Sequence, residues 1–194
     1  MKKHYSKSMF NIRIRPATLD DAEFLLSLRT HPELSRFLGT VKNCIDSQVQ
    51  WMESYLKKDD DFLFLIESDS GTPMGSIGIY GFEKSQTQGL SAEWGRWVIL
   101  PEYNIGPISS FLLFSIAFDE IGLDEVWCRT IRDNPKVIRF HNSYAAQRKL
   151  HPGFILLDNK KKPAIEHFLS KEMWFKKKTY IEKIAKITER LQNK

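Results

Sequence analysis

The segment from Val98 to Ser110 is the first place where residue types and spacing could do chemistry. It runs from an apolar strand that stops at Pro101, through a short loop, into a helix that opens at Pro107. The first turn of a helix carries unpaired N–H groups and a partial positive charge, which suit a pyrophosphate. The hydroxyl of Ser109 and that of its neighbour could add donors. The pattern is compatible with an anion site. It is equally compatible with no ligand, because many strand–loop–helix junctions bind nothing.

Other chemistries have no signature in the chain. Cys44 and Cys128 are far apart and match no CxxC spacing, so we expect neither a disulfide nor a metal site, and a reducing compartment fits. There is no P-loop lysine motif and no GxGxxG, HExxH or GxSxG pattern. The three aspartates at 59–61 are read as a solvated turn between a helix and a strand.

The elements that must position these residues belong to a chain of ordinary size and composition. Its 194 residues fit one domain, with 29 Lys+Arg against 24 Asp+Glu. Residues 160–194 hold 11 of those basic residues and 4 of the acidic ones, so the excess is a property of one end. No basic face interleaved with aromatic residues appears elsewhere, so we expect no nucleic-acid partner. No apolar run approaches the ~18 residues of a membrane span, and no signal-peptide segment is present, so a cytoplasmic protein without integral membrane contact is expected.

Hydrophobic periodicity predicts strands and helices in a mixed order. Strands are expected over 12–15, 62–66, 74–82, 92–100 and 126–131, with a hairpin of 154–157 and 165–169 around a turn at 160–162. Helices are expected over 19–29 behind Thr18, after an Asp46 cap, over 107–121, from Pro135, and after a Ser170 cap. This order predicts an α/β fold: a mixed sheet with helices on both faces, in which 94–126 forms a parallel crossover.

Three segments share their order and spacing with a known family. They are Ile-Arg-Pro-Ala-Thr-Leu-Asp-Asp-Ala at 14–22, Ala-Glu-Trp-Gly-Arg-Trp-Val at 92–98 with Pro-Glu-Tyr at 101–103, and the segment 132–141. Over 12–169 the sequence resembles the GNAT superfamily of acetyl-CoA-dependent N-acetyltransferases, in the branch that includes the ribosomal-protein-alanine acetyltransferases. The resemblance implies a mostly antiparallel sheet of six to seven strands, splayed at its two central parallel strands. It also implies a single acetyltransferase domain over 1–170 and acetyl-CoA as cosubstrate, with no metal.

The resemblance also implies which residues would hold the coenzyme. Its arm would pair with backbone near Trp97 and run between the strand 93–100 and the strand 126–131. The full implied set is Trp97, Val98, Ile99, Asn104, Ile105, Gly106, Ile108, Ser109, Ser110, Asn134, Val137 and Phe140. The family pattern Gln/Arg-x-x-Gly-x-Gly/Ala reads Asn104, Pro107 and Ser109 here. Because Pro107 has no N–H, the pyrophosphate would depend on the amides of Ile105, Gly106, Ile108 and Ser109. Asn134 is equally well read as the N-cap of its own helix.

Two residues are candidates for catalysis. Glu93, on the central strand, is the expected general base, acting directly or through water, and the alternative is an ion pair with Arg96 or Arg129. His141 stands where the family has the tyrosine thought to protonate the leaving thiolate, and the alternative is a surface histidine. Strand alternation puts Glu93, Gly95 and Trp97 on one side and Trp94, Arg96 and Val98 on the other.

The acceptor side of this superfamily is built mostly from the first two helices and their connection. Here that region offers Arg29, His31, Arg36 and Phe37, and the strands add Tyr80 and Trp94. The arginines could bind phosphate or carboxylate or be plainly solvated, and the aromatic residues could stack on a sugar or base or fill the core. The resemblance to members associated with bacterial surface-polysaccharide amino sugars favours a small-molecule amine, a nucleotide-linked amino sugar. The alternatives are a protein N-terminal amine, or a coenzyme- or partner-binding module without turnover.

Residues 171–194 are expected to form an amphipathic basic helix. Its apolar stripe is Ile181, Ile184, Ile187 and Leu191. We expect this stripe to pack on the domain or on a second subunit, which makes a homodimer possible. A membrane-surface role for the Lys-rich face is the alternative, although the stripe holds no Trp or Phe.

Overall fold

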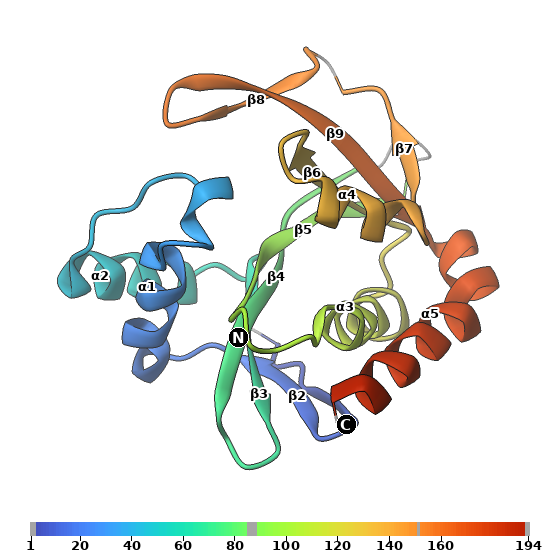
Figure 1. Cartoon of the computed structure of the whole chain (residues 1–194), viewed down its shortest axis with the longest axis horizontal. Helices are drawn as coiled ribbons and strands as arrows, with labels where there is room; N and C mark the ends of the chain where they lie inside the picture. Colours follow the sequence, from blue (N-terminus) through green and yellow to red (C-terminus); the bar gives the residue numbers. More distant parts are fainter. Residues whose placement is uncertain (1–2, 85–88, 151, 193–194) are drawn as a thin grey trace.

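The protein folds around a mixed β-sheet, seen in the computed structural model of residues 3–84, 89–150 and 152–192 (Figure 1). Its described strands run in the spatial order β1-β2-β3-β4-β5-β6-β9-β7, and β8 pairs with β9 at one side. Their bounds are β1 Lys7–Met9, β2 Ile12–Pro16, β3 Phe62–Ser68, β4 Pro73–Lys84, β5 Leu90–Ile99, β6 Glu125–Ile131, β7 Ala146–Arg148, β8 Phe154–Leu157 and β9 Lys160–Ser170. All pairs are antiparallel except β5 with β6. The predicted fold class is confirmed, with nine described strands instead of six to seven.

Helices cover both faces of the sheet. Helix α1 (Ala22–Thr30) and helix α2 (Ile45–Leu56) lie on one face, with the short turns η1 (Leu19–Asp21) and η2 (Ser35–Phe37) beside them. Helix α3 (Gly106–Ser115) lies on the other face and continues as the π-helical segment η3 (Ile116–Ile121). Helix α4 (Pro135–Asn142) and helix α5 (Lys171–Gln192) complete that side, and α5 lies along α3 (Figure 1). Within these described ranges, no helix is both long and apolar enough to cross a bilayer.

The two faces have separate hydrophobic cores because the central strands are buried on both sides. In β3, Leu63 and Leu65 face α1 and α2, where they join Leu28 and Met52. The intervening phenylalanines at 62 and 64 face α3 on the other side, as alternation along a strand requires. This sandwiched arrangement explains why the sequence of β3 is a continuous apolar run.

The parallel pair β5–β6 separates after three residue pairs. The register is Ser91 with Glu125, Ala92 with Val126 and Glu93 with Trp127, and no described pair follows. Strand β6 nevertheless stays paired with β9 as far as Ile131. The second half of β5 therefore diverges from β6, which is the splay that the resemblance implied.

A bulge in β5 changes which side chains share a face. Gly95 pairs with Gly78 and Val98 with Ser76, so Arg96 and its neighbour lie opposite a single β4 residue. Arg96 has a φ of 48°, in the left-handed region that non-glycine residues rarely adopt. The predicted alternation is consequently wrong beyond Gly95.

Two local predictions need correction, and two short strands were not predicted. Helix α2 begins at Ile45 with Cys44 in the N-cap position, so Asp46 is not the predicted cap. Asp46 lies in the first turn, where its negative charge interacts favourably with the helix dipole. The 154–170 hairpin turns at Asp158 and Asn159, both at positive φ, and residues 160–162 already belong to β9. Strands β1 and β7 are three residues each, too short for an alternation pattern to reveal them.

Helix α5 packs along α3 through a face that differs from the predicted stripe. Ile181 is buried, but Ile187 is 49% exposed, and the buried positions are instead Trp174, Ala185 and Thr188. The Ser170 hydroxyl accepts a hydrogen bond from the Met173 amide at 3.2 Å, as its predicted capping role requires. The side chain of Leu191 and residues 193–194 lie outside the described residues.

Trp174 is the residue on which the docking of α5 depends. Its ring is fully buried, stacks with Phe118 at 5.7 Å between centroids and lies 5.5 Å from Phe111. We expect Trp174→Ala to lower the free energy of unfolding by ~3–5 kcal/mol, measured by urea denaturation, because it leaves a large cavity. The adjacent Phe175→Ala is the control: Phe175 is 57% exposed, and its removal should cost less than ~0.5 kcal/mol. Equal losses in the two variants would contradict this packing.

Candidate functional site

The splay of β5 and β6 opens a pocket of about 190 Å³ that passes through the sheet. We call it the splay pocket. Its walls come from the diverging strands, from η2 and Ile155 on one side, and from α4 on the other. Of the residues predicted for the site, it collects Phe37, Tyr80, Glu93, Trp94, Trp97, Asn134, Val137 and His141. The pocket therefore joins the expected catalytic residues to parts of both the coenzyme and acceptor sets.

Glu93 lies at the last residue pair before β5 and β6 separate, and its side chain is half-buried. Tyr80 is its cross-strand partner on β4, and the Tyr80 hydroxyl donates a hydrogen bond to the Glu93 carboxylate. That phenol passes over Gly95, where a Cβ atom would come within 2.4 Å of the Tyr80 oxygen. Gly95 therefore leaves the space that the Tyr80–Glu93 contact needs.

The two arginines considered as partners of Glu93 are engaged elsewhere. Arg96 forms a two-bond ion pair with Asp61, in which Nη2 lies 3.0 Å from Oδ2. Arg129 donates from Nε to Glu166 at 3.1 Å. Among the described residues, Glu93 has no ion pair within 4 Å. Burial raises the pKa of Glu93, while Arg129, the Tyr80 hydroxyl and Arg96 oppose that rise. A carboxylate with a raised pKa in a pocket has the properties of a general base.

His141 lies inside the molecule, so the surface-histidine alternative is wrong. It is 2% exposed, and its ring contacts Trp94 and Trp97. Burial, reinforced by His167, lowers the pKa of His141 to about 3, so its ring is neutral at physiological pH. Nδ1 lies 3.3 Å from the Thr130 hydroxyl and 3.5 Å from the Cys128 sulfur, and Nε2 has no hydrogen-bond partner within the described residues.

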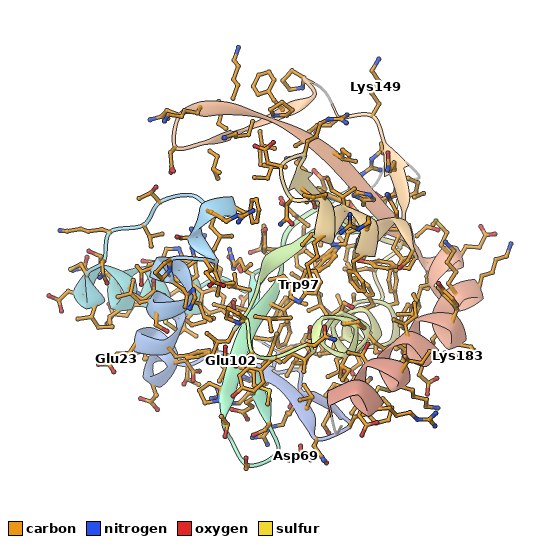
Figure 2. All side chains as sticks on the ribbon, viewed as in Figure 1. Glu23, Asp69, Trp97, Glu102, Lys149 and Lys183 are labelled. Carbon is orange, nitrogen blue, oxygen red and sulfur yellow. The ribbon has the colours of Figure 1, made fainter. Side chains whose placement is uncertain are left out.

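The aromatic residues at the splay form one cluster on the α3 and α4 side. Trp94 and Trp97 are 5.4 Å apart at their ring centroids, although simple alternation placed them on opposite sides. The Trp97 indole N–H donates to the Ser109 hydroxyl at 3.1 Å, and the Trp97 ring lies 5.4 Å from Phe140. Figure 2 places Trp97 near the centre of the molecule, between β5, α3 and α4. Trp97 thus links the wall of the splay to the start of α3.

The start of α3 offers fewer donors than the sequence suggested. Ser109 and Ser110 are fully buried, and their hydroxyls donate to the carbonyls of Gly106 and Pro107. The Ser109 amide donates to Ile105, while Ile105 and Ile108 belong to the hydrophobic core. Gly106, at the first turn, is a partly exposed residue beside the exposed loop residue Asn104. A Cβ at Gly106 would lie 3.1 Å from the Trp97 ring, so glycine allows that ring to approach the helix.

The residues predicted along β5 and α4 separate into pocket and packing roles. Val98 faces α1 and α2, whereas Ile99 packs on the α3 core. Asn134 lines the splay pocket, and its Oδ1 also accepts from the Val137 amide at 3.4 Å, so it caps α4 as well. Its two expected roles are therefore compatible.

The acceptor residues divide in the same way. Phe37 reaches the splay pocket, and Arg29 lines a neighbouring cleft between α1 and α2. Arg36 lies over the Phe37 ring at 4.3 Å, and His31 accepts at Nδ1 from the Glu33 amide, a local contact. Neither residue lines either pocket.

Sequence reasoning missed several residues that line the two pockets. Arg96 and Leu38 line both of them, Thr130 lines the splay pocket, and Lys42 and Trp51 line the α1–α2 cleft. Arg96 stood in a motif segment but was considered only as a partner for Glu93. Alternation could not place it, because the bulge rotates it toward α2.

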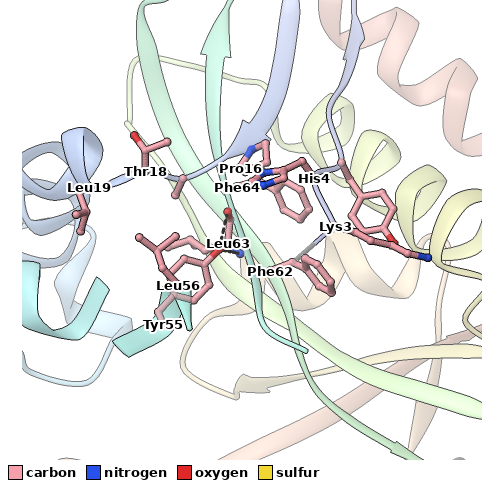
Figure 3. A pocket seen from close by; sticks show the side chains of 12 residues that line it. Lys3, His4, Pro16, Thr18, Leu19, Tyr55, Leu56, Phe62, Leu63 and Phe64 are labelled. Atoms are coloured by element: carbon pink, nitrogen blue, oxygen red, sulfur yellow. Dashed lines mark hydrogen bonds between the residues drawn. The ribbon is translucent and has the colours of Figure 1, made fainter. Parts of the chain in front are cut away.

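A third pocket, of about 150 Å³, lies away from this site (Figure 3). The N-terminal segment at Lys3 to Tyr5 covers one side of it, and Phe62 and Phe64 line the strand side. The Leu63 amide donates to the Tyr55 hydroxyl at 2.8 Å at its edge. Neither Glu93 nor His141 lines it, so it is separate from the expected catalytic residues. Across the described chain, no group of His, Cys, Asp and Glu is arranged to hold a metal ion.

Comparison with known proteins defines the class of this fold and site. The sequence model of the acetyltransferase (GNAT) domain family matches residues 11–146. This range is well over half of the chain, so the protein belongs to the GNAT acetyltransferase family. No curated protein sequence matches the chain.

Solved structures share the fold at low sequence identity. One is apo FdhC, described as a nucleotide-linked sugar GNAT: TM-score 0.76, 20% identity, covering 92% of this chain and 97% of that one. Another is a variant of the spermidine N-acetyltransferase SpeG from Vibrio cholerae: TM-score 0.71, 12% identity, covering 85% and 96%. A third is a GCN5-related N-acetyltransferase from Brucella melitensis: TM-score 0.76, 14% identity, covering 95% and 86%. At these identities the likeness establishes the fold alone.

The buried, neutral His141 predicts a specific pH dependence of stability. In the unfolded chain a histidine has a pKa of ~6.5, so unfolding takes up a proton at pH 5, where folded His141 remains uncharged. Because His141 has a lowered pKa when folded, its contribution makes the protein less stable as pH falls below ~6.5, by about 2 kcal/mol between pH 7 and pH 5. We expect His141→Gln to lose correspondingly less stability than the parent over this interval, measured by urea unfolding at both pH values. The same pH-dependent loss in both proteins would show that His141 does not stay neutral.

Proposed function

We propose that the protein is an acetyl-CoA-dependent N-acetyltransferase that acetylates a primary amine in the splay pocket. The observation that carries the proposal is the position of Glu93: a carboxylate with a raised pKa, and with no ion pair among the described residues, at the point where β5 and β6 part. Beyond it, the backbone of β5 that faces β6 has no strand partner in the described structure, so polar groups there are available to an extended ligand. Family membership supports the same reaction class.

The proposed coenzyme fits one part of the site better than another. When bound, acetyl-CoA supplies its acetyl group as an activated thioester. The unpaired edge of β5 suits an arm that contains amide groups, and Trp97, Val98 and Ile99 lie along this edge. At the start of α3, the Gly106 amide and the loop around Asn104 are the exposed groups that could meet the phosphates. Pro107 supplies no N–H there.

Glu93 is proposed to take the proton that the amine loses when nitrogen attacks the acetyl carbon. The new C–N bond forms as the C–S bond breaks, and Glu93 accepts the proton directly or through a water. The raised pKa of Glu93 makes its carboxylate a stronger base than an exposed one, and Tyr80 holds that carboxylate in place. This division assigns proton transfer to Glu93 and positioning to Tyr80.

His141 is proposed to act as a neutral hydrogen-bond donor. The Thr130 hydroxyl and the Cys128 thiol both lie at Nδ1, which favours the tautomer with its proton on Nε2. An Nε2–H without a protein partner is then available to the pocket that His141 lines. A neutral imidazole in a dry site can stabilise developing negative charge without being an imidazolium acid.

The favoured acceptor is a nucleotide-linked amino sugar. The description of the similarly folded FdhC as a nucleotide-linked sugar GNAT supports this assignment, as does the resemblance to amino-sugar members of the 92–97 segment and the loop with Pro107 that follows it. Release of free thiol from acetyl-CoA is the assay, with amino-sugar nucleotides, spermidine and peptides with free N-termini as acceptors. Turnover with the amino-sugar nucleotides is expected. Turnover on peptide N-termini alone would favour the protein-acetylating alternative, and coenzyme binding without turnover would favour an inactive module.

Replacement of Glu93 tests the base directly. We expect Glu93→Gln to lower kcat by ~10²–10⁴-fold, because the amine proton loses its acceptor, while the affinity for acetyl-CoA stays unchanged. Steady-state kinetics and calorimetric titration of acetyl-CoA measure the two quantities. Glu83→Gln, on the exposed end of β4, is the matched control and should behave as the parent. An unchanged kcat at saturating acceptor would remove Glu93 from the reaction.

The hydrogen bond from Tyr80 predicts a shift in the pH–rate profile. That bond lowers the pKa of Glu93, so its loss in Tyr80→Phe raises the pKa further. Since the base must be deprotonated to act, the acid limb of kcat against pH should move to higher pH. Gly95→Ala should move it in the same direction, because the added Cβ displaces the Tyr80 hydroxyl. If both variants keep the parent's acid limb, either Tyr80 does not tune Glu93 or Glu93 is not the titrating base.

A further inference from the structure

A second cleft, larger than the splay pocket, lies between α1, α2 and the last residues of β5. Its volume is about 460 Å³, within the range of small-molecule sites. We call it the α1–α2 cleft. The polar side chains that line it are those of Arg29, Lys42, Ser47, Gln48, Ser76 and Arg96. Three of these six carry a positive charge, and none of the described lining residues is acidic.

The three cations differ in how well they are already neutralised. Arg96 is held by the Asp61 carboxylate and lies over the Tyr80 ring at 4.2 Å. Arg29 has a weaker set of contacts: its Nη2 donates to the Gly39 carbonyl at 2.8 Å, and its Nε is buried without a partner in the described part of the chain. Lys42 is exposed at the rim and has no ion pair with any described residue. Two positive charges in this cleft therefore lack a full counter-charge.

The environment of Arg29 favours an incoming anion. Burial and the positive charge of Arg96 lower the pKa of Arg29, so the folded protein holds these two like charges near each other at a cost. The carboxylate that opposes this lowering of the pKa is that of Asp158, in the β8–β9 turn. That carboxylate is itself bonded to the Thr40 amide at 2.8 Å and to the Thr40 hydroxyl at 2.7 Å. An oxyanion in the cleft would supply the missing charge and accept from the Arg29 guanidinium.

The cleft is adjacent to the proposed reaction centre. Arg96 and Leu38 line both the α1–α2 cleft and the splay pocket, so one extended acceptor can occupy both. Its amine would then lie at Glu93 and its far end between Arg29 and Lys42. Trp51, Leu25 and Val98 give the cleft apolar walls that suit the non-polar parts of such a molecule.

We propose that the α1–α2 cleft binds the phosphate end of a small acceptor, and that Arg29 and Lys42 select this acceptor against polycationic amines. That the bound molecule is an acceptor whose amine is acetylated rests on the proposed function. The binding of its phosphate in the cleft does not. A polyamine would place its positive charges against two cations with no carboxylate lining the cleft, which is unfavourable.

Binding of uridine diphosphate to the full chain, measured by isothermal titration calorimetry without acetyl-CoA, tests the proposal. We expect Arg29→Gln and Lys42→Gln each to raise the Kd for uridine diphosphate by at least ~10-fold, since each removes a charge-assisted contact. Lys58→Gln, which removes an exposed charge at the far end of α2, should leave the Kd unchanged. If Arg29→Gln does not fold, Lys42→Gln still tests the proposal. Its fold should be unaffected, because Lys42 is exposed and its side chain has no described hydrogen bond.

Two further measurements separate the cleft from other sites. Saturating coenzyme A should not displace uridine diphosphate, because the two would occupy different pockets, and spermidine should not compete for it. Displacement by coenzyme A, competition by spermidine, or preferential binding of an acidic peptide would each overturn the proposal. So would an unchanged Kd in both Arg29→Gln and Lys42→Gln.

The two proposals fail in different ways. If uridine diphosphate binding depends on Arg29 and Lys42 but no amine causes thiol release, the anion-site proposal holds and the proposed transferase function is wrong. If Arg29→Gln and Lys42→Gln both keep the parent's kcat and acceptor KM, the proposed transferase function holds and the anion-site proposal is wrong.

Discussion

The early end of pairing between β5 and β6 is the constraint on which the rest of the molecule depends. Two parallel strands that part after Glu93 leave main-chain polar groups without a strand partner in the described structure, which is unfavourable inside a folded protein unless another group, a ligand or solvent takes them. The divergence is tolerated because each strand keeps its other neighbour: β4 holds β5, and β9 holds β6 as far as Ile131. The splay thus combines a rigid frame with an interior edge that has no described strand partner, and this combination suits the binding of an extended ligand.

The bulge in β5 gives that edge its chemistry. A regular strand would put Arg96 on the α3 face and separate Trp94 from Trp97. With the bulge, Trp94 and Trp97 join one aromatic wall against α4, while Arg96 turns to Asp61 and Tyr80 on the α2 face. The left-handed φ of Arg96 costs conformational energy, which the Asp61 ion pair and the packing of Trp97 offset. One irregular residue therefore separates the hydrophobic and the ionic sides of the site.

How far the sequence predicted this site depends on the range of the interactions. Glu93 and His141 were predicted because their neighbours form recognisable segments, and both line the splay pocket. Strands β2 to β6 were predicted because their apolar runs are long enough to show a period. The burial of Ser109 and Ser110 escaped prediction because their hydroxyls satisfy the carbonyls of their own helix, a choice that spacing does not reveal. The β5 bulge escaped prediction because the residue at its irregular position is an arginine. An arginine in a strand segment does not indicate that the register shifts by one residue there.

The α1–α2 cleft shows why total charge was a poor guide to binding. The chain's excess of positive charge is concentrated in 160–194, largely on α5, on the opposite side of the molecule from α1 and α2 (Figure 1). Beyond about one Debye length, ~8–10 Å at physiological salt, such exposed charges contribute little to a site. In the proposed anion site Arg29 contributes more because it is half-buried, and burial weakens the screening of its charge. The proposed anion recognition therefore depends on where Arg29 and Lys42 lie relative to Glu93, and that relation arises only when the chain folds and brings η2, β5 and α2 together.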